Sequence, residues 1–363
     1  MTSSSRISAY QGKRVFVTGG LGFIGSNLAL ELARLGAEVT VADSREVGCG
    51  ANDFNLAEAG DRVGRVVADI GDAAKIEPVL EGVDLVFNLA GEISHIHSIR
   101  YPERDLDLNV RAQLAFLRSC QKVAPRARVV YASSRQVYGV PGYLPVDEDH
   151  PIRPVDFNGV HQWAAENYHF LFSSLFSVDV TCLRLTNVYG PRQSLLRPCQ
   201  GFSGAFFRLA LHGENLSVYG DGLQLRDMLY VDDAVEAFLL AGAAVPNGAR
   251  VYNVGGPQPL TLRDIAHTVA RAAGRNARVE CVPFPEDRKS IDIGSYHSDT
   301  TRLRGELGWT PRTEFSRGVE QTVAFYRRFA EHYLNGPVHP PCQLATCPRE
   351  LPERVAGATR QNR

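Results

Sequence analysis

The sequence predicts an α/β fold with a doubly wound parallel sheet, because short apolar runs alternate with longer amphipathic stretches. The apolar runs are rich in β-branched residues and bounded by Gly, Asp or Ser, as buried strands are. Six segments have this character, at 14–18, 38–42, 65–68, 84–90, 128–133 and 178–185. Helical stretches separate them, including 22–35, 104–123 and 157–174. This alternation places helices on both faces of a parallel sheet, with ligands bound beyond the carboxyl ends of its strands.

The alternation weakens after residue 185, where Gly- and Pro-rich segments become frequent. We therefore expect a Rossmann-like domain at 13–185, with a return segment near 228–256, and a smaller C-terminal lid at 186–335. An N-terminal arm at 1–12 and a flexible tail at 336–363, rich in Pro, Arg and Cys, complete the expected organisation.

The composition excludes several classes of protein. The net charge is −1, with 44% hydrophobic and 22% charged residues, so no polybasic surface for nucleic acid or anionic lipid is expected. No apolar run reaches the ~18 residues that span a bilayer. The N-terminus lacks the apolar centre of a secretory signal, which predicts a cytoplasmic location. Seven cysteines without a CxxC pair predict reduced thiols and no metal site.

The segment TGGLGFIG (18–25) predicts a phosphate-binding turn, because it follows a strand and opens a helix. Gly19 allows the tight turn, Gly22 lets the backbone approach a pyrophosphate, and Gly25 lets helix and strand pack closely. The next strand ends at Asp43, whose carboxylate can accept hydrogen bonds from ribose hydroxyls and repel a 2′-phosphate. These features predict NAD as the cofactor in preference to NADP, although Arg45 could pair with a 2′-phosphate.

From the turn onward, the sequence resembles the extended short-chain dehydrogenases/reductases, specifically the NAD-dependent sugar-nucleotide epimerases and dehydratases. The resemblance extends in order over roughly 13–330. The motifs that carry it are TGGLGFIG, NLAG (88–91), SSRQVYG (133–139), LRLTNVYGPRQ (183–193), VYGDGLQLRDMLYVDDAVEAF (218–238), NVGG (253–256) and LGWTP (307–311). The resemblance implies bound NAD, a nucleotide-diphosphate sugar substrate held by the C-terminal lid, and a homodimer formed through helices near 104–123 and 157–174.

The resemblance also implies roles for individual residues. Ser134 would orient the reacting sugar hydroxyl, and the other expected substrate contacts are Asn187, Arg226, Arg288, Lys289 and Asp292. Together with the turn itself, it implies these cofactor contacts: Gly19, Gly22, Phe23, Ile24, Gly25, Asp43, Asp69, Ile70, Ala90, Gly91, Asn109 and Gln162.

The sequence departs from this family at its catalytic signature. The family carries a tyrosine base and, four residues later, a lysine that lowers the pKa of that tyrosine. Here the two positions are Asn158 and Gln162, with Glu166 fixing the register. Neither side chain can act as a base, but both can position sugar and ribose by hydrogen bonding. The predicted catalytic set is Ser134, Asn158, Gln162, Tyr138 and His95, and the candidates for a substituted base are Tyr138, Glu92, His95, His97 and His161.

Three functions remain open from the sequence. The first is an NAD-dependent epimerase of a nucleotide-diphosphate sugar, acting at C4 through a transient keto sugar. The second is a non-catalytic protein that binds NAD and a sugar nucleotide. The third, and least favoured, is a nucleotide-sugar dehydratase, because Arg135 and Gln136 occupy the positions at which 4,6-dehydratases carry an acidic pair.

Overall fold

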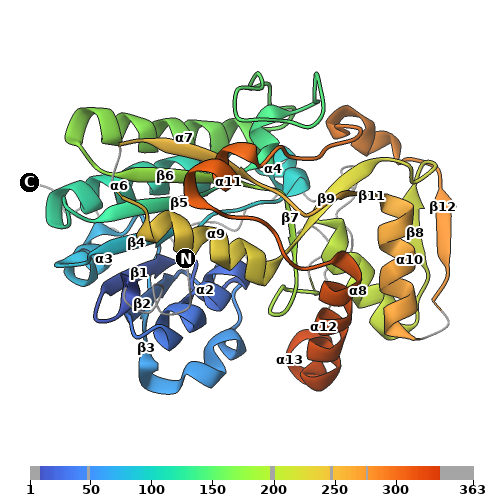
Figure 1. Cartoon of the computed structure of the whole chain (residues 1–363), viewed down its shortest axis with the longest axis horizontal. Coiled ribbons are helices and arrows are strands. Elements are labelled where there is room, and N and C mark those ends of the chain that lie inside the picture. Colours follow the sequence, from blue (N-terminus) through green and yellow to red (C-terminus); the bar gives the residue numbers. More distant parts are fainter. Residues whose placement is uncertain (1–8, 47–49, 197–200, 246–247, 275–276, 336–363) are drawn as a thin grey trace, which may run out of the picture.

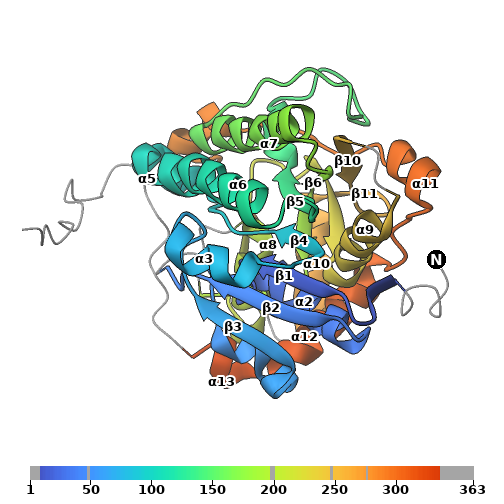
Figure 2. The ribbon, with the colours of Figure 1, turned by 90° about the vertical axis from the view of Figure 1, so that its left-hand side faces the viewer.

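A seven-stranded, entirely parallel sheet forms the centre of the computed structural model, with helices on both faces (Figures 1 and 2). The structure describes residues 9–46, 50–196, 201–245, 248–274 and 277–335. The strand order is β3-β2-β1-β4-β5-β6-β10. The first six strands in this order form the doubly wound arrangement of dinucleotide-binding folds. The predicted fold class is therefore confirmed.

The strands of the central sheet lie close to the predicted segments. They are β1 (Arg14–Thr18), β2 (Glu38–Asp43), β3 (Val63–Val67), β4 (Leu85–Asn88), β5 (Arg128–Ser134), β6 (Val180–Leu185) and β10 (Arg250–Val254). The last strand, β10, pairs in parallel with β6 and brings the chain back to the main sheet, as expected of the return segment. Because all the strands are parallel, their carboxyl ends lie along one edge.

Two hydrophobic layers cover the faces of the sheet. On one face, α2 (Phe23–Arg34) and α9 (Val231–Ala243) bury apolar side chains such as Leu28 and Phe238 against the strands. On the other face lie α3 (Ala73–Leu80), α6 (Ala112–Val123) and α7 (Phe157–Phe176), as Figure 2 shows. The helix expected at 104–123 is interrupted. It consists of α5 (Pro102–Leu106), a π-helical turn at Asp107–Arg111 and α6.

The lid lies to the right of the sheet in Figure 1 and has a separate core. Its strands are β7 (Asn187–Tyr189), β8 (Leu216–Tyr219), β9 (Leu225–Tyr230), β11 (Pro259–Thr261) and β12 (Val279–Val282). Its helices are α8 (Phe202–His212), α10 (Leu262–Ala273), α12 (Phe315–Arg328) and α13 (Ala330–Tyr333). The remaining helical segments are α4 (His95–Arg100), α11 (Thr301–Leu307), and turns at Asp53–Arg62, Arg135–Tyr138 and Glu286–Ile291.

The structure describes part of the expected N-terminal arm but none of the expected C-terminal tail. Tyr10 belongs to the expected arm, but it is buried, and its hydroxyl donates a hydrogen bond of 2.6 Å to the carbonyl of Leu239. The arm is therefore anchored at this residue by an aromatic side chain that the sequence analysis did not place in the core. The predicted tail at 336–363 lies outside the described residues. Among the described helices, none is long and apolar enough to cross a bilayer.

Candidate functional site

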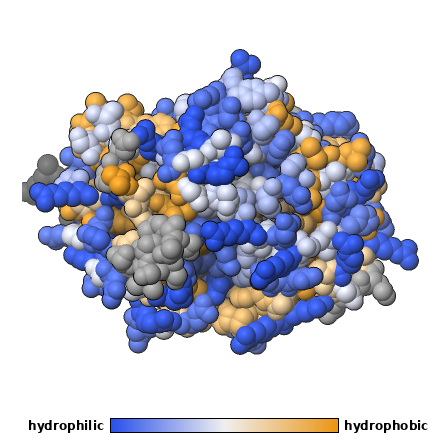
Figure 3. Space-filling view, in the orientation of Figure 1, coloured by the Kyte–Doolittle hydropathy of each residue, from blue (hydrophilic) through white to orange (hydrophobic). Residues whose placement is uncertain are grey.

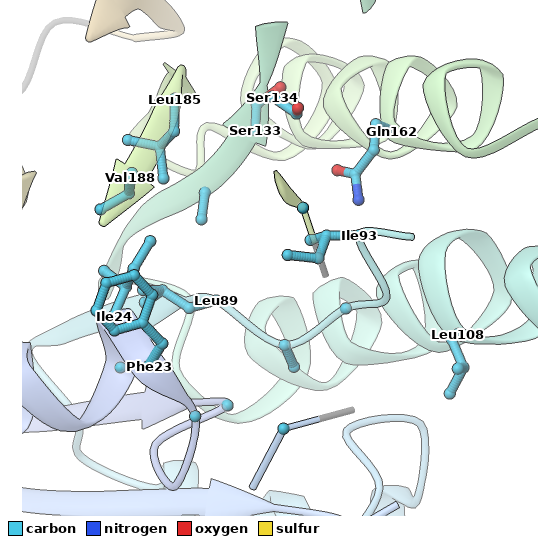
Figure 4. A pocket seen from close by; sticks show the side chains of 18 of the residues that line it. Phe23, Ile24, Leu89, Ile93, Leu108, Ser133, Ser134, Gln162, Leu185 and Val188 are labelled. Atoms are coloured by element: carbon cyan, nitrogen blue, oxygen red, sulfur yellow. The ribbon is translucent and has the colours of Figure 1, made fainter. Parts of the chain in front are cut away.

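A cavity of about 350 Å³ opens at the carboxyl edge of the sheet, a volume within the ~300–1,000 Å³ range of small-molecule sites. Its walls come from the β1–α2 turn, the ends of β2, β4 and β5, helix α7, and the start of the lid at β7. Figure 4 shows Phe23 and Ile24 near Leu89 on one side, and Ser133, Ser134 and Gln162 on the other. The cavity thus joins the phosphate turn to the expected catalytic segment.

The phosphate turn has the backbone that the sequence predicts. Gly19 has a φ of +65°, and a Cβ there would lie 2.8 Å from the carbonyl oxygen of Leu89. At Gly25 a Cβ would lie 2.3 Å from the carbonyl oxygen of Gly19. Gly22 precedes the first turn of α2, whose free amides and dipole favour an anion. Only glycine fits at Gly19 and Gly25, so the turn is shaped to let a pyrophosphate approach the backbone.

Asp43 lies at the end of β2 and lines the same cavity. Its carboxylate oxygens accept hydrogen bonds from the amides of Leu21 at 3.1 Å and Arg45 at 2.9 Å. Burial raises the pKa of Asp43, partly offset by those amides. The guanidinium of Arg45 forms an ion pair of 2.6 Å with Asp53, which holds this cation on an internal partner. The arrangement fits an adenosine ribose without a 2′-phosphate.

Most of the predicted cofactor contacts line the cavity. They are Gly19, Gly22, Phe23, Ile24, Gly25, Asp43, Asp69, Ile70, Ala90, Gly91 and Gln162. Asn109 is the one predicted cofactor contact that does not line the cavity, because it is buried behind the cavity wall. Its side chain accepts a hydrogen bond from the amide of Glu92 and donates one to the carbonyl of Glu92, both at 2.9 Å. Asn109 therefore holds the loop after β4 rather than reaching the cavity.

Asn158 is fully buried and does not line the cavity. Its amide donates hydrogen bonds to the carbonyl of Glu92 at 2.8 Å and to the carboxylate of Asp105 at 2.9 Å. The same carboxylate pairs with Nδ1 of His161 at 2.6 Å. The expectation that Asn158 positions sugar or ribose therefore does not hold in this structure. Asn158 and His161 belong instead to a buried polar network that joins α7 to α5.

Gln162, one turn further along α7, does line the cavity. Its Oε1 accepts a hydrogen bond of 2.9 Å from the hydroxyl of Tyr131, and its Nε2 donates one of 3.4 Å to the carbonyl of Glu92. Tyr131 also lines the cavity, and the sequence analysis missed it. Its position near the carboxyl end of β5 was the available signal. Burial raises the pKa of Tyr131 well above its usual value, so its phenol stays a neutral donor.

His95 lines the cavity and pairs with two side chains. Its Nδ1 contacts the carboxylate of Asp156, and its Nε2 lies 2.8 Å from Nε2 of Gln136. Asp156 also caps α7, accepting a hydrogen bond of 2.7 Å from the amide of Gly159. Burial alone would raise the pKa of Asp156, but the hydrogen bond and charge of His95 outweigh it and hold that pKa below its usual range. An ionised Asp156 fixes the proton on Nδ1, so Nε2 carries the lone pair and accepts a hydrogen bond from the Gln136 amide, which a substrate hydroxyl would have to displace.

Ser134 ends β5 and lines the cavity next to this pair. Its hydroxyl oxygen accepts a hydrogen bond of 3.2 Å from the amide of Gln136, which caps the short turn at Arg135–Tyr138. Arg135 and Gln136 line the cavity as well. The segment that follows β5 therefore presents a hydroxyl, a guanidinium and an amide to one space.

Tyr138 lies away from the cavity, in a small hydrophobic cluster. Its hydroxyl donates a hydrogen bond of 2.7 Å to Asn253 and accepts one of 2.8 Å from Arg184. Burial raises the pKa of Tyr138 to about 12, even with Arg184 opposing it. The structure therefore does not bring Tyr138 to the cavity with Ser134 and His95. The other sequence candidates for the base, Glu92, His97 and His161, also lie outside the cavity lining, and His95 alone of the five reaches it.

Of the predicted substrate contacts other than Ser134, one lines the cavity and four do not. Asn187 lines the cavity, and its buried Nδ2 has no hydrogen-bond partner among the described residues, which leaves a donor for a ligand. Arg226 does not line it, since its guanidinium donates to the carbonyls of Leu225 at 2.7 Å and Gly294 at 2.5 Å. The other three also lie outside the lining: Arg288 over the ring of Tyr219, Lys289 paired with Glu286, and Asp292 bonded to the amide of Gly294.

Comparisons with known proteins agree with this geometry. Residues 15–255 match the model of the NAD dependent epimerase/dehydratase family. The chain belongs to the NAD dependent epimerase/dehydratase family. This membership confirms the resemblance stated from the sequence, and NAD is the cofactor of the family, as predicted.

Individual members of this family align over nearly the whole chain. A UDP-glucose 4-epimerase of Mycolicibacterium smegmatis is 32% identical, over 86% of this chain and 98% of its own length. An epimerase structure from Methanothermobacter thermautotrophicus superimposes with a TM-score of 0.83 at 28% identity, over 90% of this chain and 96% of that one. A dTDP-glucose 4,6-dehydratase from Streptomyces venezuelae, solved with NAD bound, gives 0.78 at 28% identity, over 87% and 97% of the two chains. Other relatives are named as nucleotide-sugar decarboxylases.

Proposed function

We propose that this protein is an NAD-dependent epimerase of a nucleotide-diphosphate sugar, acting at C4 through a transient keto sugar. The observation that carries the proposal is a single cavity that joins the Gly19–Gly25 turn and Asp43 to Ser134 and His95. One end fits a dinucleotide, and the other presents a hydroxyl beside a polarised imidazole. Relatives that are named as 4-epimerases support the choice of reaction.

The residues of the cavity can serve both halves of such a reaction. Bound NAD supplies the hydride acceptor for the sugar carbon and later returns the hydride. Ser134 orients the C4 hydroxyl by hydrogen bonding, and Nε2 of His95 takes its proton while Asp156 stabilises the resulting imidazolium. After the keto sugar turns over in the cavity, the same imidazolium returns the proton to the carbonyl oxygen. Proton and hydride are both restored, so the reaction is redox-neutral overall.

His95 replaces the function of the missing tyrosine in this scheme, and Gln162 takes over part of the function of the missing lysine. The amide of Gln162 faces the cavity from α7, where it can hydrogen-bond a ribose hydroxyl. It carries no charge, so it does not lower the pKa of a neighbouring base. In place of a lysine, Asp156 orients the imidazole of His95 and can stabilise its protonated form.

A panel of nucleotide sugars tests the proposed reaction. Purified protein is assayed for bound NAD and then incubated with the UDP, dTDP and GDP derivatives of neutral hexoses and of hexuronic acids, and products are followed by proton NMR. We expect the C4 epimer to appear from one of them, with transient NADH absorbance during turnover. Tight binding of a nucleotide sugar without any epimer would contradict the proposal and favour the non-catalytic binding protein. A dehydrated 4-keto-6-deoxy product would instead establish a dehydratase.

We also propose that the protein is a homodimer that pairs through α6 and α7. Five large apolar side chains on α7 are exposed: Phe157 at 47%, Val160 at 48%, Leu171 at 49%, Leu175 at 69% and Phe176 at 48%. Figure 3 shows apolar surface at the upper left, over the region where α7 runs in Figure 1. Apolar groups that gather on one face mark an interaction surface.

Substitution on this helix tests the dimer. Leu175→Glu is expected to convert the dimer to a monomer in sedimentation analysis, because it places a charge in the apolar contact. Val245→Glu is the matched control, since Val245 is 87% exposed and lies outside α7. A wild-type protein that sediments as a monomer, or a Leu175→Glu variant that remains dimeric, would refute this surface as the interface.

A further inference from the structure

Arg135 is a cation in the wall of the cavity without an anionic partner. It follows Ser134 directly and begins the turn at Arg135–Tyr138. Its guanidinium lies 5.0 Å from the centroid of the Tyr296 ring. Within the described parts of the chain, that guanidinium makes neither a hydrogen bond nor an ion pair. Arg135 is partly buried, and cations withdrawn from water are normally paired, so the missing partner calls for an explanation.

The acids closest to Arg135 are already occupied. Asp156 holds His95 and the amide of Gly159. Asp227 accepts hydrogen bonds from the hydroxyl of Thr186 and, at 3.0 Å, from the amide of Ser298. Neither carboxylate lies within 4.0 Å of the Arg135 guanidinium as an ion pair. The charge of Arg135 is therefore left for something that enters the cavity.

The electrostatic surroundings reinforce this conclusion. Burial lowers the pKa of Arg135, although Tyr296, Asp227 and Asp156 oppose the effect. The pKa of Arg226 is lowered to about 10. Burial of Arg226 is the largest cause, and the nearby positive charge of Arg135 is the second. The positive charge of Arg135 therefore disfavours the charged form of Arg226 in the free protein. An anionic group of a bound substrate beside Arg135 would offset this effect.

We propose that Arg135 binds a carboxylate on the sugar, so that the substrates of this protein are nucleotide-diphosphate uronic acids rather than neutral hexoses. The inference rests on the proposed function, whose sugar site it specifies. Arg135 adjoins Ser134, which would hold the reacting hydroxyl, and Gln136, which touches His95. This places Arg135 in the wall at the sugar end of the cavity. A planar guanidinium matches a carboxylate with two parallel hydrogen bonds.

The protein should discriminate uronic acids from neutral hexoses because a neutral sugar leaves the Arg135 cation unpaired. A neutral hexose carries a hydroxymethyl group where a uronic acid carries the carboxylate, and it would enclose Arg135 without neutralising it. A site that hydrogen-bonds a polar group of its substrate strongly rejects an analogue that lacks this group, because the polar groups of the site are then left unpaired. An apolar pocket rejects an analogue with one additional polar group less strongly. We therefore expect the acid to bind about 10- to 100-fold more tightly than its neutral counterpart.

Calorimetry on the full-length, NAD-loaded protein tests the preference independently of turnover. UDP-glucuronate is titrated against UDP-glucose, and the pair is repeated with dTDP. In the Arg135→Gln variant the two affinities should converge, because the acid loses its cationic partner and the neutral sugar no longer encloses an unpaired cation. Arg135→Lys should retain part of the preference, because it keeps the charge but loses the fork. Arg317→Gln, which removes an exposed arginine on α12, is the matched control and should change neither affinity.

Several results would overturn the proposal. Equal affinity of the wild-type protein for acid and neutral sugars would do so, as would failure of the acid to bind with either base. An equal loss for both sugars in Arg135→Gln would assign Arg135 to the diphosphate instead. Circular dichroism shows whether the Arg135→Gln variant is folded, and the Arg135→Lys variant gives a second, more conservative test of the same position. Epimer formation is measured by NMR in a separate experiment. If the protein prefers the acid but forms no epimer, only the proposed reaction is refuted. If it epimerises a neutral sugar and shows no preference for the acid, only the assignment of Arg135 is refuted.

Discussion

The His95→Gln variant is expected to lose about 10²- to 10⁴-fold in kcat, the range that a positioned general base contributes. Glutamine keeps the approximate length of the side chain and can still donate a hydrogen bond to Asp156. It cannot accept a proton, so only the chemical step should suffer. Steady-state kinetics on the sugar that the NMR panel identifies gives kcat. Calorimetry on the same variant should show NAD and nucleotide-sugar binding within about threefold of the wild type.

His267→Gln is the matched control for this prediction, because His267 is exposed on α10, far along the chain from the cavity lining. Its kcat should equal that of the wild type. Asp156→Asn should lower kcat as well, since the amide no longer holds the imidazole proton on Nδ1. If His95→Gln turns over at the wild-type rate, the proton acceptor is another group and the His95–Asp156 assignment fails.

Glu166→Gln is expected to lower the free energy of unfolding by about 3–5 kcal/mol. Glu166 is fully buried and forms an ion pair with Arg184 behind the cavity wall, where Ser133 also donates a hydrogen bond of 2.6 Å to it. Removing its charge leaves the Arg184 guanidinium buried without a compensating anion. Because the guanidinium also contacts Tyr138, the disturbance should reach the turn that carries Arg135. Urea unfolding followed by circular dichroism measures the change.

The exposed pair of Glu31 and Arg34 on α2 provides the comparison. Its atoms approach to 2.6 Å, but the Arg34 side chain is 61% exposed. Glu31→Gln should therefore change the free energy of unfolding by no more than about 1 kcal/mol. Equal effects of the two substitutions would show that the buried pair contributes no more than a surface pair, and that Glu166 has no special structural role.

The central sheet was predictable because buried parallel strands leave a local signature. Strand β1 spans the predicted residues, and the observed bounds of β2 and β5 extend theirs by one residue. The Gly19–Gly25 turn was predictable for a similar reason, since its backbone geometry excludes other residues at fixed spacing. The π-helical turn at Asp107–Arg111 was not predictable from periodicity, because its side-chain partners lie elsewhere in the chain.

The site was only partly predictable, because its decisive contacts join residues far apart in sequence. His95 and Asp156 are 61 positions apart, and no local pattern indicates their pairing. Asn158 and Gln162 were expected to face the cavity together from one side of α7. The structure separates them, because Asp105, 53 positions from Asn158, draws its amide away from the cavity. Long-range polar partners decide these orientations, and hydrophobic periodicity carries no information about them.

The network around Asn158 disfavours a tyrosine at this position. A phenol at this position would have to displace an amide that has no solvent-exposed surface and that bonds to both Asp105 and the Glu92 carbonyl. Asp105 would then retain His161 but lose a neutralising donor, and the Glu92 carbonyl would lose one of the three side-chain amides that donate to it. A tyrosine at position 158 would therefore require changes in the surrounding residues as well.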